Sequence, residues 1–502
     1  MSMPAEHLSS TPTLTELLQG YADAPPIAVH GIASDSRQVR AGFVFLACQG
    51  AGSHGLDYLA DARAAGASAV VYDRSTATST EDSGLPMIGV DRLGEKLGEI
   101  ANRFYARPSE ALRVIGVTGT NGKTTVAWLI AQCAQLLGKR CGYIGTLGHG
   151  IDEIEGDTGM TTPPAIELHG VLADFVEDGA DYAAMEVSSH GLAQGRTDGV
   201  RFEAALFTNL TRDHLDYHAS MHDYFETKAR LFLESDTHNR IINLDSEFGT
   251  QLAARCGEQV VTVSTKFDRV ANGRPYVFVR SVVLNSKGSD VRFVSSWGDG
   301  RFTLHLPGDF NVANAALVLA LMLQQGVPVQ AASDVLSQVQ APPGRMQRVA
   351  GQGPTVYVDY AHTPNAIEAA LRALRPHCRG KLWCVFGCGG RRDAGKRPLM
   401  AKLAERLADR VVITSDNPRD EDPLDIIEAA VVGLSRLDAA TVIEDRASAI
   451  AWTLQQAGEL DIVLIAGKGH EGYQQVGDDK RPFSDYAVAE AALAAVSKEE
   501  QR

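Results

Sequence analysis

The chain has 502 residues, of which 44% are hydrophobic and 22% charged, a composition typical of a globular protein with about two to four domains. Its 47 Lys and Arg against 62 Asp and Glu give a net charge of -15, which argues against a nucleic-acid-binding surface. The seven cysteines are scattered, which predicts a chain in the reducing cytoplasm without a disulfide framework. The N-terminus has no basic segment followed by an apolar run, so no signal peptide is expected.

The first predicted domain, residues 1–112, combines short strands with a helix. Strands are expected in 42–48, 67–73 and 86–90, and a helix in 58–65. This mixture predicts a small α/β domain.

The second predicted domain, 113–342, opens with the strand RVIGVTG and then alternates strands with helices, which favours a parallel sheet covered by helices. Between Pro275 and Pro307 the pattern changes to alternating strands with Gly-rich turns, as in an antiparallel flap. A helix is expected over 312–325. Its most apolar part, 315–323, is shorter than the roughly 20 residues that span a bilayer, so no membrane insertion is expected.

The third predicted domain, 343–502, begins at Pro342, Pro343 and Gly344, which predict a hinge. Four apolar strands alternate with helical stretches, and this pattern predicts a Rossmann-like α/β domain. In such sheets ligands bind at the carboxyl ends of the strands. Functional residues are therefore expected in the loops AHTPN, GCGGRRD, SDNPR and GKGHEGY.

The segment TGTNGKTT, residues 118–125, lies between a β-branched strand and a helical run. Glycines there allow backbone N–H groups to approach phosphate, Lys123 supplies a point charge, and Thr124 supplies a hydroxyl for Mg²⁺. Gly119 and Gly122 are separated by two residues, whereas the usual P-loop has about four before its Gly-Lys pair. The alternative is a Gly-Lys turn that caps a helix. The context favours a phosphate loop but does not separate a motor, kinase, GTPase or ligase.

Acidic and histidine side chains follow two later strands. Glu186 ends the strand YAAMEV, where a carboxylate can bind Mg²⁺ or simply be solvated. The loop TRDHLDYH lacks a cysteine or a spaced histidine pair for zinc, so a hard cation held with nucleotide phosphates is favoured. Lys228, taken by its own context, is predicted to be an ordinary surface lysine.

Together these motifs resemble the Mur ligases, which are ATP-dependent amino-acid ligases of peptidoglycan precursor synthesis. The chain carries, in that family's order, GTNGKTT, MEVSSHGL, TNLTRDHLDYH, PGDFNVANA, PGRMQ, DYAHTPN, FGCGGRRDAGKRP, SDNPR and AGKGHE. The resemblance covers nearly the whole chain. It is greatest to the member that adds the third peptide residue to UDP-N-acetylmuramoyl-L-alanyl-D-glutamate.

The resemblance implies an α/β fold of three domains: an N-terminal UDP-binding domain, a central P-loop-type ATPase domain with a parallel sheet, and a C-terminal Rossmann-like domain for the amino acid. It implies catalytic roles for Lys123, Glu186, His214 and Lys228. Mg²⁺ would be held by Thr124, Glu186, His214 and a carbamylated Lys228. ATP contacts are implied for Gly119, Thr120, Asn121, Gly122, Lys123, Thr124, Thr125, Asn311, Arg345 and Asp359. UDP-substrate contacts are implied for Ser34, Ser36, Gly52, Ser53, His54, Thr161, Thr162, Ser188, Gln194 and Arg196.

The SDNPR loop bears on amino-acid specificity. Family members that add meso-diaminopimelate read Asp-Asn-Pro-Arg here, whereas lysine-adding members replace the arginine. Diaminopimelate has a distal carboxylate that lysine lacks, and the guanidinium of Arg419 can bind it bidentately; the alternative is a solvated charge after a turn proline. Two positions depart from the family pattern, with Arg391 and Gln347 where acids are frequent. Diaminopimelate contacts are implied for Arg392, Asp416, Asn417, Pro418, Arg419, Gly467 and Glu471.

The implied reaction activates the D-glutamyl γ-carboxylate with ATP and Mg²⁺ and then joins it to the amine of meso-diaminopimelate. A monomer without nucleic-acid or membrane partners is expected. Three alternatives stay open: a lysine-adding ligase, a folylpolyglutamate synthetase-like ligase, and a P-loop NTPase that hydrolyses ATP without ligation.

Overall fold

The computed structural model describes residues 11–50, 52–77, 84–156, 159–266, 273–285, 288–436 and 440–499. The chain forms two compact units, one up to Val263 and the other from Val277 onward, and the connecting segment is divided between them. The first ten residues, on which the expectation of no signal peptide depends, lie outside the described residues. The domain boundaries after residues 112 and 342 remain predictions.

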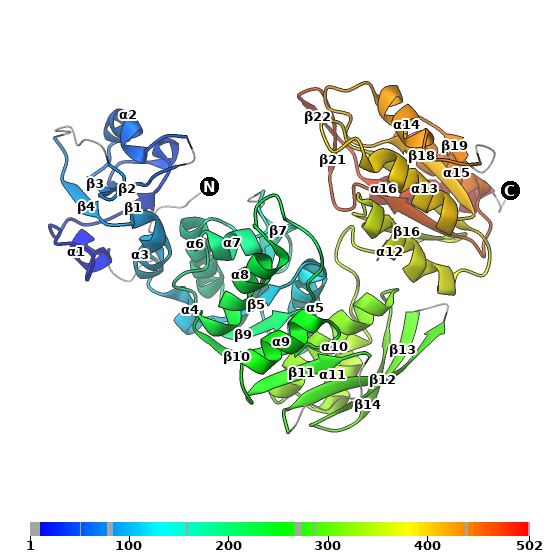
Figure 1. The fold of residues 1–502 in the computed structure, drawn as a ribbon, viewed down its shortest axis with the longest axis horizontal. Helices are drawn as coiled ribbons and strands as arrows, with labels where there is room; N and C mark the ends of the chain where they lie inside the picture. Colours follow the sequence, from blue (N-terminus) through cyan, green and yellow to red (C-terminus); the bar gives the residue numbers. More distant parts are fainter. Residues whose placement is uncertain are drawn as a thin grey trace. The chain divides into compact units, whose positions relative to one another are not determined.

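The first unit begins with a parallel sheet in the order β1-β2-β3-β4 (Figure 1). Apolar side chains are buried on both faces of this sheet, as expected for parallel strands. The predicted strands and helix are confirmed, whereas β1 is too short to show a sequence pattern. The strands are β1 (Gly31–Ala33), β2 (Phe43–Ala47), β3 (Ala69–Asp73) and β4 (Met87–Val90). The helices are α1 (Leu14–Leu17), η1 (Ser36–Gln38), η2 (Gly55–Tyr58), α2 (Leu59–Ala64), η3 (Leu93–Lys96), α3 (Leu97–Phe104) and α4 (Pro108–Ala111).

A second sheet of the first unit has the order β11-β10-β9-β5-β8-β6-β7. Its neighbouring strands are parallel except for the β6–β7 pair, so the predicted parallel sheet is confirmed. The strands are β5 (Arg113–Thr118), β6 (Cys141–Gly145), β7 (Gly148–Gly150), β8 (Tyr182–Glu186), β9 (Phe202–Phe207), β10 (Thr237–Asn243) and β11 (Val260–Ser264). The helices are α5 (Lys123–Leu136), α6 (Ala165–Glu177), α7 (Ser189–Ala193), α8 (Met221–Leu233) and α9 (Glu247–Arg255).

The second unit begins with the predicted antiparallel flap, in the order β14-β13-β12. The helix α10 that follows is apolar around most of its circumference and is buried accordingly. The elements are β12 (Tyr276–Asn285), β13 (Gly288–Ser295), β14 (Gly300–Leu304), α10 (Asp309–Gln324) and α11 (Val329–Leu336).

The rest of the second unit is built on a sheet in the order β15-β16-β20-β17-β18-β19, parallel except for the β15–β16 pair. The four predicted strands are confirmed. The strands are β15 (Gln347–Arg348), β16 (Thr355–Asp359), β17 (Leu382–Cys388), β18 (Arg410–Ser415), β19 (Ala440–Val442) and β20 (Ile462–Ala466), followed by the hairpin of β21 (Tyr473–Val476) and β22 (Asp479–Pro482).

Helices cover both faces of this sheet, and buried apolar clusters lie on each face. Local sequence sets several helix starts: Thr363 and Asp422 accept N-cap hydrogen bonds, and a proline follows each. The helices are α12 (Pro364–Leu374), η4 (Arg375–His377), α13 (Lys396–Leu407), α14 (Pro423–Val431), α15 (Arg446–Gln456) and α16 (Asp485–Glu499). In the described part of the chain, no helix is long and apolar enough to cross a membrane.

Candidate active site

The segment TGTNGKTT joins β5 to α5 and requires glycine at both of its glycine positions. Gly119 has φ of +145°, and a Cβ there would lie 1.9 Å from Thr208 Oγ1. Gly122 has φ of +86° and is the N-cap of α5. Side chains are disfavoured at such φ values. The loop geometry therefore explains the glycines, and the partial positive charge at the helix N-terminus favours an anion.

The residues after β9 hold this loop in place. Thr120 N donates to Asn209 O at 2.9 Å, and Asn121 N donates to Asn209 Oδ1 at 3.1 Å. Thr208 Oγ1 donates to Asn121 O at 2.6 Å. The ammonium of Lys123 lies over the same loop and donates to the carbonyl oxygens of residues 119 and 120. The loop is thus preorganised, and its ammonium carries a positive charge that would neutralise a bound phosphate group.

Gly119→Ala should weaken ATP binding about tenfold or more, because a positive φ and the contact with Thr208 together strain the loop by about 1–3 kcal/mol. Titration calorimetry with ATP measures this effect. Gly138→Ala is the matched control, since Gly138 also has a positive φ, of +74°, but an added Cβ there meets nothing within 4 Å. Equal losses of affinity in both variants would contradict the prediction.

Glu186 ends β8, and its side chain is only 1% exposed. Its Oε1 accepts hydrogen bonds from Tyr143 OH at 2.6 Å and from Thr146 N at 2.9 Å. Its Oε2 accepts one from Thr124 Oγ1 at 3.0 Å. The carboxylate therefore lies beside a hydroxyl of the phosphate loop, and both are the hard oxygen donors that Mg²⁺ prefers.

The donor set suits a magnesium ion that arrives with a nucleotide. Within the described ranges, no group of three or more His, Cys, Asp and Glu side chains could hold a metal ion. Mg²⁺ usually keeps several waters and binds through one or two carboxylates together with substrate phosphates. Thr124 and Glu186 fit that role, because the remaining ligands of the ion would be water and phosphate oxygens.

Three residues predicted to bind the UDP substrate lie beside Glu186. Thr162 Oγ1 donates to Glu186 O at 2.9 Å, and Ser188 N donates to Thr162 Oγ1 at 2.9 Å. Thr161 Oγ1 lies 3.1 Å from Thr146 Oγ1, which itself donates to Glu186 Oε2. These hydroxyl groups and the predicted magnesium ligand form one continuous network of hydrogen bonds.

Two further residues predicted to contact the UDP substrate, Gln194 and Arg196, extend this network. Arg196 Nη1 donates to Thr162 O at 2.6 Å, and Arg196 Nε donates to Gln194 Oε1 at 3.0 Å. Burial lowers the pKa of Arg196, which reflects partial loss of hydration from the guanidinium. A partly desolvated guanidinium is well suited to a phosphate or carboxylate of a substrate.

The remaining predicted UDP contacts follow two strands of the first sheet. Ser34 and Ser36 come directly after β1, and residues 52–54 come shortly after β2. Because β1 and β2 are parallel neighbours, both segments lie at the same edge of their sheet. His54 Nδ1 accepts from Leu56 N at 3.0 Å and thereby caps η2. The part that these residues play in binding remains a prediction.

His214 lies in a cluster of aromatic and imidazole rings. It has φ of +52°, and its Nε2 lies 3.6 Å from Asp213 Oδ2. The rings of His190 and His214 are 5.0 Å apart, and those of His190 and His218 are 6.0 Å apart. Burial and the neighbouring imidazoles lower the pKa of His190. The magnesium role of His214 remains a prediction.

Lys228 is buried, at 1% exposure, so the expectation of a surface lysine from its own context is wrong. It lies on the same face of α8 as Tyr224 and Phe232, which are also buried at spacings of four residues. Lys228 Nζ lies 3.5 Å from Thr118 Oγ1 and 4.7 Å from the centroid of the Tyr224 ring. Burial and the positive charge of Lys123 lower the pKa of Lys228 well below its ordinary value. This environment favours an uncharged, nucleophilic amine.

Three predicted ATP contacts belong to the second unit. Asn311 is buried in the first turn of α10, and its Nδ2 donates to Pro307 O at 2.8 Å. Asp359 ends β16, and its Oδ2 accepts from Met346 N at 2.7 Å. Burial raises the pKa of Asp359, and the nearby guanidinium of Arg345 opposes this rise. Arg345 also lies over the Tyr360 ring, at 4.6 Å from its centroid, an aromatic neighbour that the sequence motifs did not indicate.

The predicted amino-acid residues lie in loops at the carboxyl ends of β17, β18 and β20. Arg419 Nη1 donates to Gly390 O at 2.7 Å, which uses one of the five guanidinium N–H groups. A Cβ on Gly389 would lie 3.1 Å from Arg419 Nη1 and 3.6 Å from Arg392 Cγ. Both predicted carboxylate-binding arginines are therefore beside the same loop.

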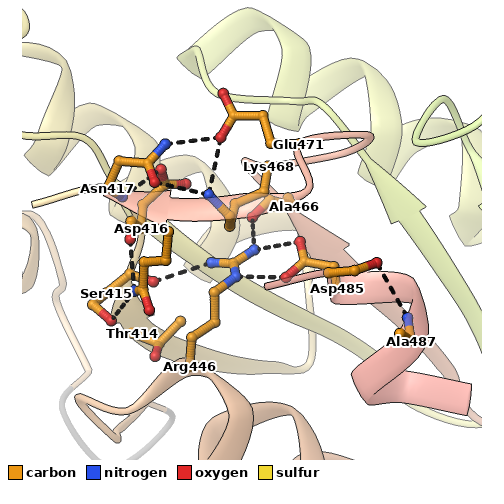
Figure 2. Close-up of polar contacts among 12 residues, drawn as sticks. Thr414, Ser415, Asp416, Asn417, Arg446, Ala466, Lys468, Glu471, Asp485 and Ala487 are labelled. Carbon is orange, nitrogen blue, oxygen red and sulfur yellow. Dashed lines mark hydrogen bonds and ion pairs between the residues drawn. The ribbon is translucent and has the colours of Figure 1, made fainter. Parts of the chain in front are cut away.

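Asn417 and Glu471 are joined directly (Figure 2): Asn417 Nδ2 donates to Glu471 Oε2 at 2.8 Å. Gly467 has φ of +118°, and a Cβ there would lie 2.6 Å from Asp416 Oδ2. The loops after β18 and β20 thus pack so closely that position 467 requires glycine. The structure brings Asp416, Asn417, Gly467 and Glu471 together, and Pro418 connects them to Arg419.

Two buried cations near these loops were not found by sequence reasoning. Lys468 is 0% exposed and bonds to Asn417 and Glu471. Arg446 pairs with Asp485 through bonds of 2.7 Å, and both side chains are fully buried (Figure 2). The sequence offers only a weak indication of their burial: Lys468 lies between two glycines after an apolar strand, and Arg446 is the first residue of a helix.

The two departures from the family pattern have local partners. Arg391 forms an ion pair with Asp420, and its backbone N donates to Glu421 Oε1 at 2.5 Å. Gln347 Oε1 accepts from Gly344 N at 2.8 Å. An amide oxygen fills this acceptor role as a carboxylate would, so the substitution leaves the backbone donor satisfied.

Family models match most of the chain. A model of the Mur ligase middle domain matches residues 117–322, one of the Mur ligase glutamate ligase domain matches 344–469, and one of the Mur ligase family catalytic domain matches 28–105.

Individual relatives agree with these models. A UDP-N-acetylmuramoyl-L-alanyl-D-glutamate--2,6-diaminopimelate ligase of Pseudomonas putida is 44% identical over 484 residues, covering 95% of this chain and 97% of that protein. A ligase of the same name from Haemophilus influenzae is 43% identical over 470 residues, covering 92% and 96%.

Solved structures share the fold. One of a ligase with this name has a TM-score of 0.72 at 34% identity, covering 97% of this chain and 99% of that chain. A folylpolyglutamate synthase of Mycobacterium tuberculosis, with a TM-score of 0.58 at 19% identity over 74% of this chain and 92% of its own, shares the fold alone. On the domain matches and the identity to full-length relatives, this chain belongs to the Mur ligase family.

Proposed function

We propose that this chain is an ATP-dependent ligase that joins meso-2,6-diaminopimelate to UDP-N-acetylmuramoyl-L-alanyl-D-glutamate in peptidoglycan precursor synthesis. The position of Arg419 carries the choice of amino acid: it lies in the SDNPR loop after β18 and keeps guanidinium N–H groups for a carboxylate. Relatives named as diaminopimelate ligases are 43–45% identical to the chain over more than nine-tenths of its length, which supports the same choice.

The proposed first step activates a poor electrophile. An oxygen of the D-glutamyl γ-carboxylate attacks the γ-phosphorus of ATP, the bond to ADP breaks, and an acyl phosphate forms. Lys123 would neutralise charge on the transferred phosphoryl group, and the N-terminus of α5 would hold the phosphates. Thr124, Glu186, His214 and a carbamylated Lys228 would hold Mg²⁺, which supplies positive charge to the phosphate oxygens when bound.

The proposed second step forms the amide. The amine of diaminopimelate attacks the acyl carbon, a tetrahedral intermediate collapses, and phosphate leaves with the former carboxylate oxygen. The attacking nitrogen loses its proton to phosphate or water. Arg419 and Arg392 would hold the distal carboxylate, while Glu471 would accept hydrogen bonds from the distal ammonium.

Arg419→Ala should raise KM for diaminopimelate by about 10–100-fold and leave KM for ATP within about twofold, because a charge-assisted bidentate contact contributes roughly 1.5–3 kcal/mol. Steady-state phosphate release with each substrate varied in turn measures the two constants. Arg391→Ala is the control, since Arg391 pairs with Asp420 outside the proposed contact. An equal rise of both KM values in Arg419→Ala would refute a dedicated carboxylate contact.

The proposed function is tested by measuring whether phosphate release requires all three substrates. We expect ATP to be consumed only when the UDP-linked dipeptide and diaminopimelate are both present, and mass spectrometry to find the ligated tripeptide. Hydrolysis of ATP at the same rate with and without the UDP-linked dipeptide and diaminopimelate would indicate a P-loop NTPase instead. Ligation of glutamate to a folate would indicate the folylpolyglutamate synthetase-like alternative.

For the assembly we propose a monomer that acts in the cytoplasm, where ATP is supplied. Light scattering at the concentration of the activity assay tests the first part. A stable dimer would contradict it.

A further inference from the structure

Lys468 lies in the loop after β20, and its side chain is completely buried. Its Nζ donates to Asn417 Oδ1 at 2.9 Å and to Glu471 Oε2 at 2.9 Å (Figure 2). A lysine is rarely buried unless its charge is paired. Here Glu471 pairs with the charge and Asn417 accepts a further hydrogen bond, and the proposed function assigns both residues to the amino acid.

Lys468 also determines which way the amide of Asn417 points. Asn417 Oδ1 accepts from Lys468 Nζ and from Gln475 N at 2.9 Å, so both of its lone pairs are used. Asn417 Nδ2 donates to Glu471 Oε2. A flipped amide would turn its NH₂ group toward two donors and its oxygen toward a carboxylate, so this orientation is strongly favoured.

The fixed orientation leaves specific groups for a ligand. Among the described residues, Glu471 Oε1 accepts no hydrogen bond, and Asn417 Nδ2 keeps one of its two N–H groups. Glu471 is partly exposed, at 20% of its side chain. A carboxylate oxygen thus lies next to an amide N–H, with the remaining donors of Arg419 on the same loop as Asn417. This set complements a group that carries both an ammonium and a carboxylate.

We infer that Lys468 is a positioning residue for amino-acid specificity, which acts through Asn417 and Glu471 to present a paired acceptor and donor to the zwitterionic end of the amino acid. The inference rests on the proposed function. It assigns Lys468 no contact with the substrate. It gives a role to a buried lysine in the loop that also carries Gly467 and Glu471, two residues assigned to the amino acid by the proposed function.

Lys468→Met tests this role because methionine keeps the length of the side chain and removes its charge and donors. We expect KM for diaminopimelate to rise at least tenfold, KM for ATP and for the UDP-linked dipeptide to stay within about twofold, and kcat at saturation to change less than KM. The preference for diaminopimelate over L-lysine should fall as well, because lysine lacks the distal carboxylate.

Lys480→Met is the matched control. Lys480 Nζ lies 4.4 Å from the centroid of the Tyr473 ring, and Lys468 Nζ lies 5.6 Å from the same centroid. Lys480 is exposed on β22. Both substitutions remove a positive charge beside Tyr473, but only Lys468 bonds to Asn417 and Glu471. The control should therefore leave all three KM values unchanged.

A double-mutant cycle with Glu471→Gln shows whether Lys468 acts through Glu471. The effect of Lys468→Met on KM for diaminopimelate should be at least threefold smaller in the Glu471→Gln background. Equal effects in both backgrounds, or a parallel rise of all three KM values, would overturn the inference. If Lys468→Met and the polar variant Lys468→Gln both lose the native circular dichroism spectrum, Lys468 serves the fold rather than specificity and the inference is wrong. A wild-type enzyme that does not use diaminopimelate would instead contradict the proposed function.

Discussion

Lys228→Met is expected to lower kcat for ligation by about 10²–10³-fold, the loss typical of removing one preorganised charge-stabilising group from an active site. Burial and the charge of Lys123 favour the neutral amine of Lys228. A neutral amine can attack CO₂ and, after losing a proton, carries a carbamate anion. That anion would lie near Lys123, in a position to help hold Mg²⁺. An unmodified neutral lysine would offer no charge there, and its replacement would have little effect.

Two measurements check this prediction. Native mass spectrometry at neutral pH should find wild-type protein heavier by one CO₂, and the added mass should disappear in acid and in Lys228→Met. Steady-state kinetics should show the loss of kcat with little change in melting temperature. Lys139→Met is the control, because Lys139 is an exposed lysine near Asp181. A Lys228→Met variant with wild-type kcat would contradict a catalytic role.

Arg446→Met is expected to lower the free energy of unfolding by about 3–5 kcal/mol, the usual effect of removing one partner of a buried ion pair. The loss should fall on the sheet that contains β18 and β20. Asp485 would be left charged and buried. Arg446 Nη2 also donates to Ala466 O at 2.9 Å, and Nη1 donates to Ser415 O at 3.3 Å. These carbonyls end β20 and β18, so the same guanidinium supports the two strands that carry the amino-acid loops.

Urea unfolding of the wild type, Arg446→Met and the double variant Arg446→Met/Asp485→Leu measures this effect. The double variant should recover part of the lost stability, because no charge remains buried, but the two carbonyls would still lack their donor. Equal stability of the single variant and the wild type would show that the pair does not support the sheet.

Much of the fold could be predicted because its strands are continuous apolar runs. β16, β17, β18 and β20 are buried on both faces, so their sequences stand out without knowledge of their partners. The phosphate loop could be predicted for a related reason: its glycines and lysine are adjacent in sequence, and their chemistry depends on local backbone geometry.

The residues that sequence reasoning missed depend on distant partners. Arg446 is buried because Asp485, 39 positions later, pairs with it, and Lys468 bonds to Asn417, which is 51 positions earlier. Lys228 is similar, since its own neighbours indicate a surface residue and only the resemblance singled it out. Its burial follows from helix periodicity together with packing against Tyr224. A charged residue whose partner is far away in sequence carries no local pattern.

A direct competition between amino acids tests whether this chain ligates meso-diaminopimelate. Purified protein with ATP, Mg²⁺ and UDP-N-acetylmuramoyl-L-alanyl-D-glutamate is offered equal concentrations of meso-diaminopimelate and L-lysine, and mass spectrometry counts the two tripeptide products. We expect the diaminopimelate product to exceed the lysine product by at least about 100-fold, the ratio that corresponds to roughly 2.7 kcal/mol of discrimination by a charged contact. A predominance of the lysine product, or no tripeptide at all, would show that this chain is not a diaminopimelate ligase.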